Sequence, residues 1–387
     1  MKTNFKKLLY SGVTLMSIGV LAACSSTSSS TTTSSSKATS QSSAATTSSN
    51  STSSDSSSSS SSIDWSALPT TEVTLSNDGL KITEGGTYIL TGSTTAGVTV
   101  ETDANVRIIL AGAEISSSDT AAINVISADN VELELQDGTT NTVKDTSNHT
   151  DTNIEGAIHV EADLTITGNG SLTVEGNFQD GIVSTDDLVI DAGNITVTAV
   201  DDGVRGKDSM TINGGTITVT AGGDGIKSTN DTDTTKGYTT ITGGEITVTA
   251  GDDGIKAETA LTIDGGTISV PESVEALEGT NITINGGTID VYGSDDAINA
   301  ASTASSDIFI KVTGGDLTVA VGSGDTDAFD ANGDIYISGG TIDVTAPTSA
   351  FDFDGTAELT GGTVTVNGEQ ITEITASGPG AGGHGGW

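Results

Sequence analysis

The alternation of apolar and polar residues predicts short β-strands along most of the chain. Segments 215–221 (GTITVTA), 244–250 (GEITVTA) and 287–293 (GTIDVYG) carry an apolar residue at every second position. A period of two is that of a strand with one buried face. In the first segment it places Ile217 and Val219 inside and the threonines outside. No helical period follows residue 24, so the predicted class is all-β.

Paired glycines show that these strands belong to a repeat. The pairs begin at Gly214, Gly243, Gly265, Gly286, Gly314, Gly339 and Gly361. Their separations run from 21 to 29 residues around a base period of about 22, and polar inserts at 228–238 and 301–307 account for longer intervals. Such short strands cannot each bury a core, but stacked repeats can. The predicted architecture is a solenoid, a parallel β-helix with about 22 residues per coil and projecting loops at the inserts.

One apolar residue per coil is expected to fill the interior of this solenoid. The predicted column is Ile182, Val204, Ile226, Ile255, Leu277, Ile298, Phe329 and Phe351. We therefore interpret the two phenylalanines as core residues and not as platforms for sugar stacking. Aromatic residues make up only 3% of the chain, so a flat aromatic surface of the kind that binds cellulose is poorly supported.

The first 62 residues have the composition of an export signal and a tether. Three lysines precede an apolar run that ends in LAAC, which resembles a lipoprotein cleavage site. We predict a lipoprotein signal peptide at 1–23, an acylated Cys24 with a flexible Ser/Thr-rich linker at 24–62, the β-helix at 63–376 and a Gly-rich tail at 377–387. An ordinary signal peptide with a bystander cysteine is the alternative. The expected location is the surface of a Gram-positive bacterium, on the outer face of its cytoplasmic membrane, with the lipid anchor as the sole membrane contact and the protein as a monomer.

The chain is strongly acidic. It has 52 Asp and Glu against 13 Lys and Arg, a formal net charge of −39 at pH 7. Such a surface repels nucleic acid and anionic lipid, so neither is an expected partner. The regular apolar positions exclude a disordered chain. The carboxylates therefore need another explanation.

Many of these carboxylates form a column in register with the coils. The column, just before the inward residues, is Asp180, Asp202, Asp224, Asp253, Glu275, Asp296 and Asp327. Neighbouring coils lie about 4.8 Å apart, so these like charges repel unless cations intervene. Ca²⁺ suits such a column because it takes six to eight oxygen ligands in flexible geometry. The predicted Ca²⁺ ligands are Asp201, Asp202, Asp224, Asp252, Asp253, Asp295 and Asp296.

A simpler interpretation is that each Asp-Gly makes a turn, with glycine at positive φ. It explains Asp224 well but not the doubled acids. In GDDGIK at 251–256, Gly254 is expected to turn the chain and Ile255 to fill the core. Asp252, Asp253 and Lys256 would then remain for binding a cation and a sugar.

Three basic residues follow the acids on adjacent coils. Arg205, Lys227 and Lys256 each stand three positions after a column acid, and we predict that they bind an anionic sugar together with Ca²⁺. Further along the chain their position is taken by Glu278, Asn299, Asp330 and Asp352. That end of the column is nearly all acidic and is expected to hold structural calcium.

Three motifs carry a family resemblance: GLKITEGGTYILTG near the start, DGTTNTVKD at 137–145 and the repeated DGIK…TINGGTITVTA units. By these motifs, over roughly residues 70–370, the chain resembles the bacterial carbohydrate-binding lipoproteins with a polysaccharide-lyase-like, right-handed parallel β-helix. The resemblance implies right-handed coils, bound Ca²⁺ and binding of plant cell-wall glycans, acidic polygalacturonate among them. The partner it implies is therefore a polysaccharide.

Three functions remain open at this point. The leading hypothesis is calcium-assisted binding of polysaccharide, including uronic acid glycans, without catalytic residues. A calcium-dependent pectate-type lyase would need a Lys or Arg base, and the surrounding negative charge opposes the lowered lysine pKa that this requires. A structural or adhesive solenoid is the third. Nucleophilic hydrolysis lacks its parts, because His149, His159 and His384 lie outside the repeated cluster.

Overall fold

The computed structural model describes residues 63–302, 304–324 and 326–376. All of them belong to the unit that begins at residue 62. The predicted signal peptide 1–23, Cys24, the linker 24–62 and the tail 377–387 lie outside the described residues. Within the described part, no helix is long and apolar enough to cross a membrane, and the first element is a short 3₁₀ helix, η1 (Trp65–Ala67).

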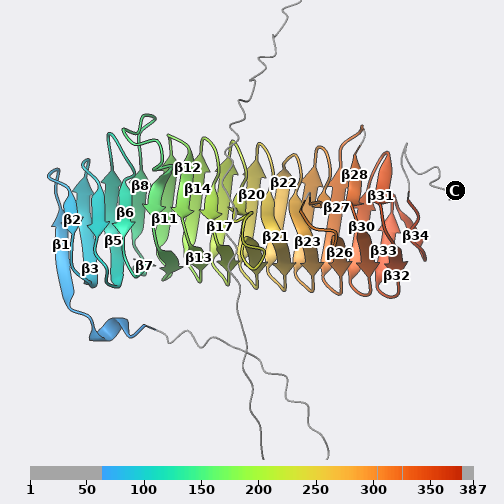
Figure 1. Ribbon diagram of the computed structural model, residues 1–387, viewed down its shortest axis with the longest axis horizontal. Coiled ribbons are helices and arrows are strands. Elements are labelled where there is room, and N and C mark those ends of the chain that lie inside the picture. Colours follow the sequence, from blue (N-terminus) through green and yellow to red (C-terminus); the bar gives the residue numbers. More distant parts are fainter. Residues whose placement is uncertain (1–62, 303, 325, 377–387) are drawn as a thin grey trace, which may run out of the picture. The chain divides into compact units, whose positions relative to one another are not determined.

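The strands stack in successive coils and form three faces of a solenoid (Figure 1). The first face consists of β1 (Thr70–Leu75), β3 (Gly86–Thr94), β5 (Val106–Ser116), β7 (Asn130–Leu135), β10 (Asp163–Thr167), β13 (Asp187–Ile190), β16 (Ser209–Ile212), β19 (Tyr238–Ile241), β21 (Ile255–Ile263), β23 (Leu277–Ile284), β26 (Phe309–Val312), β29 (Asp334–Ile337) and β32 (Ala357–Leu359). The ends of β3 and β5 continue onto the second face, and the beginnings of β21 and β23 belong to the third.

The second face, after β3 and β5, consists of β8 (Thr140–Lys144), β11 (Ser171–Gly176), β14 (Asn194–Ala199), β17 (Thr216–Ala221), β20 (Glu245–Ala250), β22 (Thr267–Glu272), β24 (Thr288–Gly293), β27 (Asp316–Val321), β30 (Thr341–Thr345), β33 (Thr363–Val366) and β34 (Glu369–Ile371). The third face consists of β2 (Leu80–Ile82), β4 (Val98–Glu101), β6 (Ile123–Ser127), β9 (Gly156–Val160), β12 (Asp180–Ser184), β15 (Val204–Gly206), β18 (Ile226–Ser228), β25 (Ile298–Ala300), β28 (Asp327–Ala331) and β31 (Ser349–Phe353).

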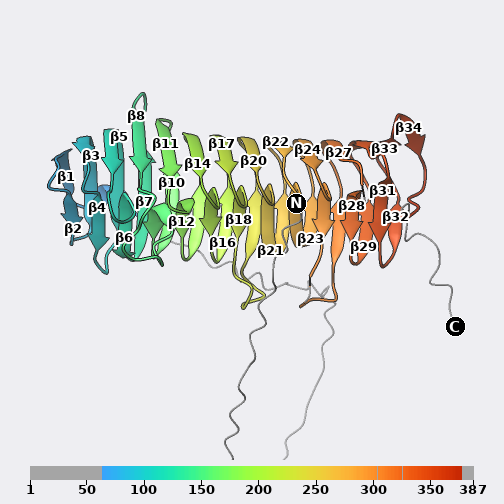
Figure 2. The same ribbon diagram turned by 90° about the horizontal axis from the view of Figure 1, so that it is seen from above.

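The strand pairing is parallel throughout the described residues except between β33 and β34 at the C-terminal end. On the second face the register joins Ile195 to Ile217, Ile217 to Ile246 and Ile246 to Ile268. The predicted all-β, parallel, solenoid-like fold is confirmed. The inserts lie between β18 and β19 and between β25 and β26, where loops leave the strand layer (Figure 2).

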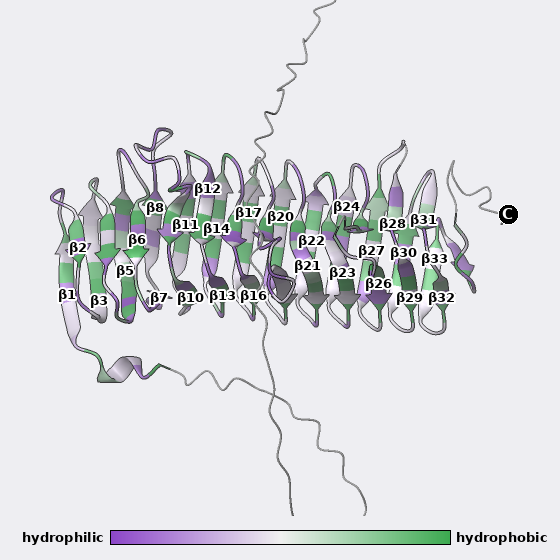
Figure 3. Ribbon diagram, in the orientation of Figure 1, coloured by the Kyte–Doolittle hydropathy of each residue, from purple (hydrophilic) through white to green (hydrophobic). Residues whose placement is uncertain are grey.

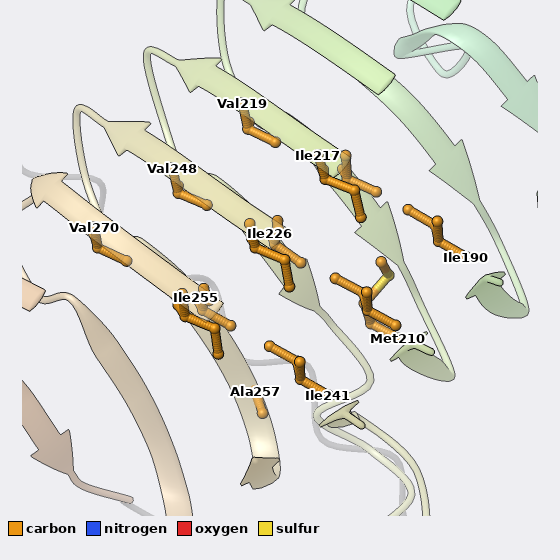
Figure 4. Packing of buried hydrophobic residues seen from close by; sticks show 14 of the residues in the cluster. Ile190, Met210, Ile217, Val219, Ile226, Ile241, Val248, Ile255, Ala257 and Val270 are labelled. Atoms are coloured by element: carbon orange, nitrogen blue, oxygen red, sulfur yellow. The ribbon is translucent and has the colours of Figure 1, made fainter. Parts of the chain in front are cut away.

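The interior is a continuous stack of aliphatic side chains. The apolar positions of successive coils align along the solenoid (Figure 3), and Figure 4 shows Val219, Ile226 and Ile255 among the side chains that meet inside. Every member of the predicted inward column is at most 2% exposed. Phe329 and Phe351 stack with ring centroids 5.2 Å apart. Their assignment to the core is therefore confirmed.

Two kinds of glycine allow this stacking. The second glycine of each pair turns the chain in the left-handed region, as at Gly244 with φ 98° and Gly266 with φ 93°. Gly254 is not of this kind: it lies at the bend before β21, as predicted, but its φ is not in the left-handed region. A Cβ at Gly254 would lie 2.6 Å from both Ala276 O and Val270 Cγ1. Glycine is required there because the next coil packs against its Cα.

Candidate functional site

The predicted acidic column lies at the corner where the second face passes into the third. Asp202 stands between β14 and β15, Asp224 between β17 and β18, and Asp253 between β20 and β21. All three are buried, at 4 to 6% exposure. The repeat therefore places one carboxylate per coil at the same corner, as the spacing predicts.

Hydrogen bonds between coils hold these carboxylates in place. The backbone N–H of Asp202 donates to Asp180 Oδ1 at 3.1 Å, that of Asp224 to Asp202 Oδ1 at 3.0 Å, and that of Asp253 to Asp224 Oδ1 at 2.9 Å. The same bond joins Asp327 N to Asp296 Oδ1 at 2.8 Å. In each of the four acceptor residues, Oδ1 thus satisfies a backbone N–H of the next coil. This interaction was not predicted from the sequence.

The other carboxylate oxygens contact the predicted basic residues. Lys227 Nζ lies 2.6 Å from Asp202 Oδ2 and 3.0 Å from Asp224 Oδ2, and Lys256 Nζ lies 2.7 Å from Asp253 Oδ2. Arg205 contacts Asp180 Oδ2 at 3.0 Å. Each base is also close to a further acid or bridges two, so its charge is compensated inside the protein. A direct role of the three bases in sugar binding stays a prediction.

The lysines are held in their charged form. Burial alone would lower the pKa of Lys227, but its hydrogen bond to Asp202 and the charge of Asp224 raise it. The pKa of Lys256 is raised in the same way, against desolvation, by Asp253 and Glu278. Neither amine is therefore suited to act as a general base near neutral pH.

The companion acids Asp201, Asp252 and Asp295 are exposed, unlike the column acids beside them. One carboxylate oxygen from each of Asp224, Asp252 and Asp253 lies within 4.8 Å of the others. A second such group consists of Asp253, Glu275 and Glu278. Among the described residues, Asp201, Asp202, Asp295 and Asp296 join no group of this kind. Both groups lie on the coils around Asp253, and the second brings two glutamates close to that aspartate.

The pKa values show how crowded this corner is. Desolvation, with the charges of Asp253 and Asp296, raises the pKa of Glu275 to about 7 despite a hydrogen bond from Asn299. Desolvation and a hydrogen bond with Glu278 likewise raise the pKa of Asp253 to about 7. Without a cation, these groups reduce their repulsion by holding protons.

The acidic end continues along the same register. Glu278 pairs with Asn299, Asn299 with Asp330, and Asp330 with Asp352. Desolvation and the charges of neighbouring acids raise the pKa of Asp330 to about 7. Asn299 is 8% exposed, and its Oδ1 has no hydrogen-bond partner among the described residues. The predicted change from a mixed to an acidic end is thus present in the structure.

The histidines correct one sequence interpretation. His159 does not lie outside the repeated cluster, because it pairs with Val183, which pairs with Arg205 on the next strand. His149 lies in the segment between β8 and β9, where Nε2 is 2.9 Å from Asp145 Oδ2 and the ring stacks on Phe178. This segment has no counterpart in the other coils and shifts the spacing, so the sequence repeat does not reveal the register of His159.

Comparisons with known proteins find similar sequences and a similar fold. Residues 76–328 match the family model described as "Carbohydrate-binding domain-containing protein". A curated protein of that description from Acetivibrio thermocellus is 35% identical over 135 residues, which are 33% of this chain and 47% of the relative. The chain thus spans about half the length of that relative. The solved structure of a polysaccharide lyase-like protein from C. thermocellum, a gadolinium derivative, is similar with a TM-score of 0.50 and 32% identity over 56% of this chain and 92% of the other.

Proposed function

Because this chain belongs to the carbohydrate-binding domain-containing proteins, we propose that it binds polysaccharide, uronic acid glycans included, with Ca²⁺ at the acidic corner as the bridge. The carrying observation is the group formed by Asp253, Glu275 and Glu278, whose carboxylate oxygens lie within 4.8 Å of one another. A hard cation there would replace the protons that Asp253 and Glu275, with their raised pKa values, otherwise hold.

The donor set fits Ca²⁺ better than a transition metal. It consists of oxygens alone, and a flexible ion can share carboxylates whose other contacts are already made. Asp252 is exposed beside the buried Asp224 and Asp253, so it can complete the coordination from the solvent side. Ca²⁺ at this position would present open coordination positions to a ligand carboxylate.

The charge of the protein supports a metal bridge. A formal net charge of −39 repels a polyuronate chain over the range of the Debye length. A carboxylate of the glycan can therefore approach a carboxylate of the protein only with a cation between the two. Arg205, Lys227 and Lys256 have their charges compensated by protein acids. In this proposal they position the column, and the cation provides the attraction.

The remaining elements of the proposal concern the fold and the location. They are a right-handed coil of about 22 residues and a lipid anchor at Cys24 that tethers a monomer to the bacterial surface through the linker 24–62. The similar solved structure is called polysaccharide lyase-like, which keeps pectate-type lysis as a second candidate. The raised pKa values of Lys227 and Lys256 oppose it.

Calcium removal tests the proposal directly. Titration of the protein with a short oligogalacturonate is expected to show binding in Ca²⁺ and at least about a tenfold loss of affinity in EDTA, which corresponds to about 1.4 kcal/mol. Asp252→Asn, an exposed change that spares the fold, is expected to weaken binding, whereas the exposed Glu245→Gln on the second face is the matched control. Equal affinity in EDTA would exclude the calcium bridge. An unsaturated product would establish lysis, and retention of no glycan would favour a structural role.

A further inference from the structure

A groove lies at the N-terminal end of the second face, away from the acidic column. It has a volume of about 410 Å³, within the range of small-ligand sites. The polar residues that line it are Ser93, Thr95, Glu114, Ser116, Thr142, Lys144 and the buried Thr94. The sequence did not predict a binding site at these residues.

Three consecutive strands build the groove through their register. Ser93 at the end of β3 pairs with Glu114 of β5, which pairs with Thr142 of β8. One step along, Ser116 of β5 pairs with Lys144 of β8. Residues two apart on a strand share a face, so these side chains form two rows, about 6.6 Å apart along each strand and about 4.8 Å apart between strands. The buried Ile115 and Val143 between the rows point into the core.

The groove offers hydrogen-bonding groups that the protein does not use. Among the described residues, the side chains of Ser93, Glu114, Thr142 and Lys144 have no hydrogen bond or ion pair with the protein. They supply two hydroxyls, one carboxylate acceptor and one ammonium donor. Because the strand ladders fix the backbone beneath them, a ligand would not have to order a loop in order to bind.

The charges of the groove select among ligand classes. One acid and one base give it no net charge, unlike the acidic corner. A hard cation would find only one carboxylate there, and a phosphate would meet one lysine beside a glutamate in a strongly acidic protein. An apolar molecule would leave the polar groups unpaired. A chain of sugar hydroxyls, each both donor and acceptor, meets all of these groups.

We propose that this groove is a metal-independent subsite for two or three residues of an uncharged glycan. The groove lies where β3, β5 and β8 of the second face end, and the acidic column follows further along the solenoid, from Asp180 of β12 onward. A glycan that runs along the solenoid would place neutral residues in the groove and uronic acid residues at the column. The proposal rests on polysaccharide binding as the function of the protein, and it adds a second site with a different requirement.

Steric block of the groove tests this site. The full chain is titrated in EDTA with cellohexaose, xylohexaose and mannohexaose. At least one is expected to bind with a Kd of about 0.1 to 1 mM. Thr142→Tyr is expected to weaken that binding at least about tenfold, and Lys144→Gln about three- to tenfold. Thr218→Tyr is the matched control, since it is the same column position three coils on and should bind as the wild type does. Aromatic residues are well tolerated on an exposed strand, so both tyrosine variants are expected to fold.

The outcomes separate the groove from the acidic corner. If oligogalacturonate binds in Ca²⁺ but none of the three neutral probes binds in EDTA, the groove proposal is overturned and the proposed function stands. The same holds if Thr142→Tyr binds the neutral probe as tightly as Thr218→Tyr. If neither class of glycan binds under any condition, both proposals fail. Binding of a neutral probe that Thr142→Tyr alone abolishes, with Ca²⁺ dependence of oligogalacturonate unchanged, assigns the groove.

Discussion

In EDTA, the free energy of unfolding is expected to fall by about 3 kcal/mol between pH 5 and pH 8, and saturating Ca²⁺ is expected to remove most of this fall. Asp253, Glu275 and Asp330 have pKa values raised to about 7, mainly by desolvation. Their folded pKa lies above the unfolded value, so they stabilise the fold at low pH, and that stability is lost as the pH rises through about 7.

The expected loss of stability follows from the raised pKa values, reduced by solvent screening and by coupling between the groups. One such group, taken alone, would lose about 2.7 kcal/mol between pH 5 and 7, at 1.36 kcal/mol per pH unit. Solvent exposure and mutual coupling reduce the sum. His159 acts in the opposite direction, because burial and the charge of Arg205 lower its pKa to about 4. It costs stability as the pH falls below its unfolded value of about 6.5.

Chemical denaturation at several pH values, with and without Ca²⁺, measures the slope. Glu275→Gln should flatten it, since one titrating group is removed, whereas Glu245→Gln on the second face should leave it unchanged. Ca²⁺ binds the deprotonated groups and should stabilise the protein most at pH 8. A slope that Ca²⁺ does not alter would contradict a cation at Asp253, Glu275 and Glu278, although the crowding of the acids would still stand.

The interior of the solenoid could be predicted because its information is local. A period of two within a strand and a repeat between strands together fix which residues point inward, and Ile226, Ile255 and Phe329 follow from that alone. The acidic column was predictable for the same reason. Its members recur at the spacing of the strands, so a column in the sequence becomes a column at one corner.

The contacts at that corner could not be read from spacing. One example is the oxygen of Asp224 that accepts the N–H of Asp253, and another is the contact of Lys256 with Glu278 on the next coil. Both depend on the backbone geometry between coils whose residues are more than 20 positions apart in the sequence. Gly254 shows the same limit, since the sequence indicates the bend but not that the next coil packs against the Cα of this glycine. The groove escaped prediction because residues 93–144 carry irregular inserts that hide the repeat.

Replacing Lys256 by methionine is expected to destabilise the protein by about 2 kcal/mol at pH 8 in EDTA. The change keeps the aliphatic stem and removes the charge that Asp253 and Glu278 share. Asp253 is 6% exposed in its side chain, and an uncompensated buried charge costs 3 to 5 kcal/mol when it is fully enclosed. The smaller figure applies because the lysine side chain is 25% exposed and Asp253, whose pKa is raised, can take up a proton.

The matched control is Lys236→Met, which removes an ion pair with Asp208 from a lysine that is 43% exposed. It should cost clearly less than Lys256→Met, because exposed ion pairs contribute little to stability. In the double variant with Asp253→Asn, the loss from Lys256→Met should shrink, and the coupling energy of the cycle measures the pair itself. Because Ca²⁺ can supply the missing positive charge, it should recover more stability in Lys256→Met than in the wild type. Equal losses from the two lysine variants would mean that the corner is solvated well enough to need neither lysine nor metal.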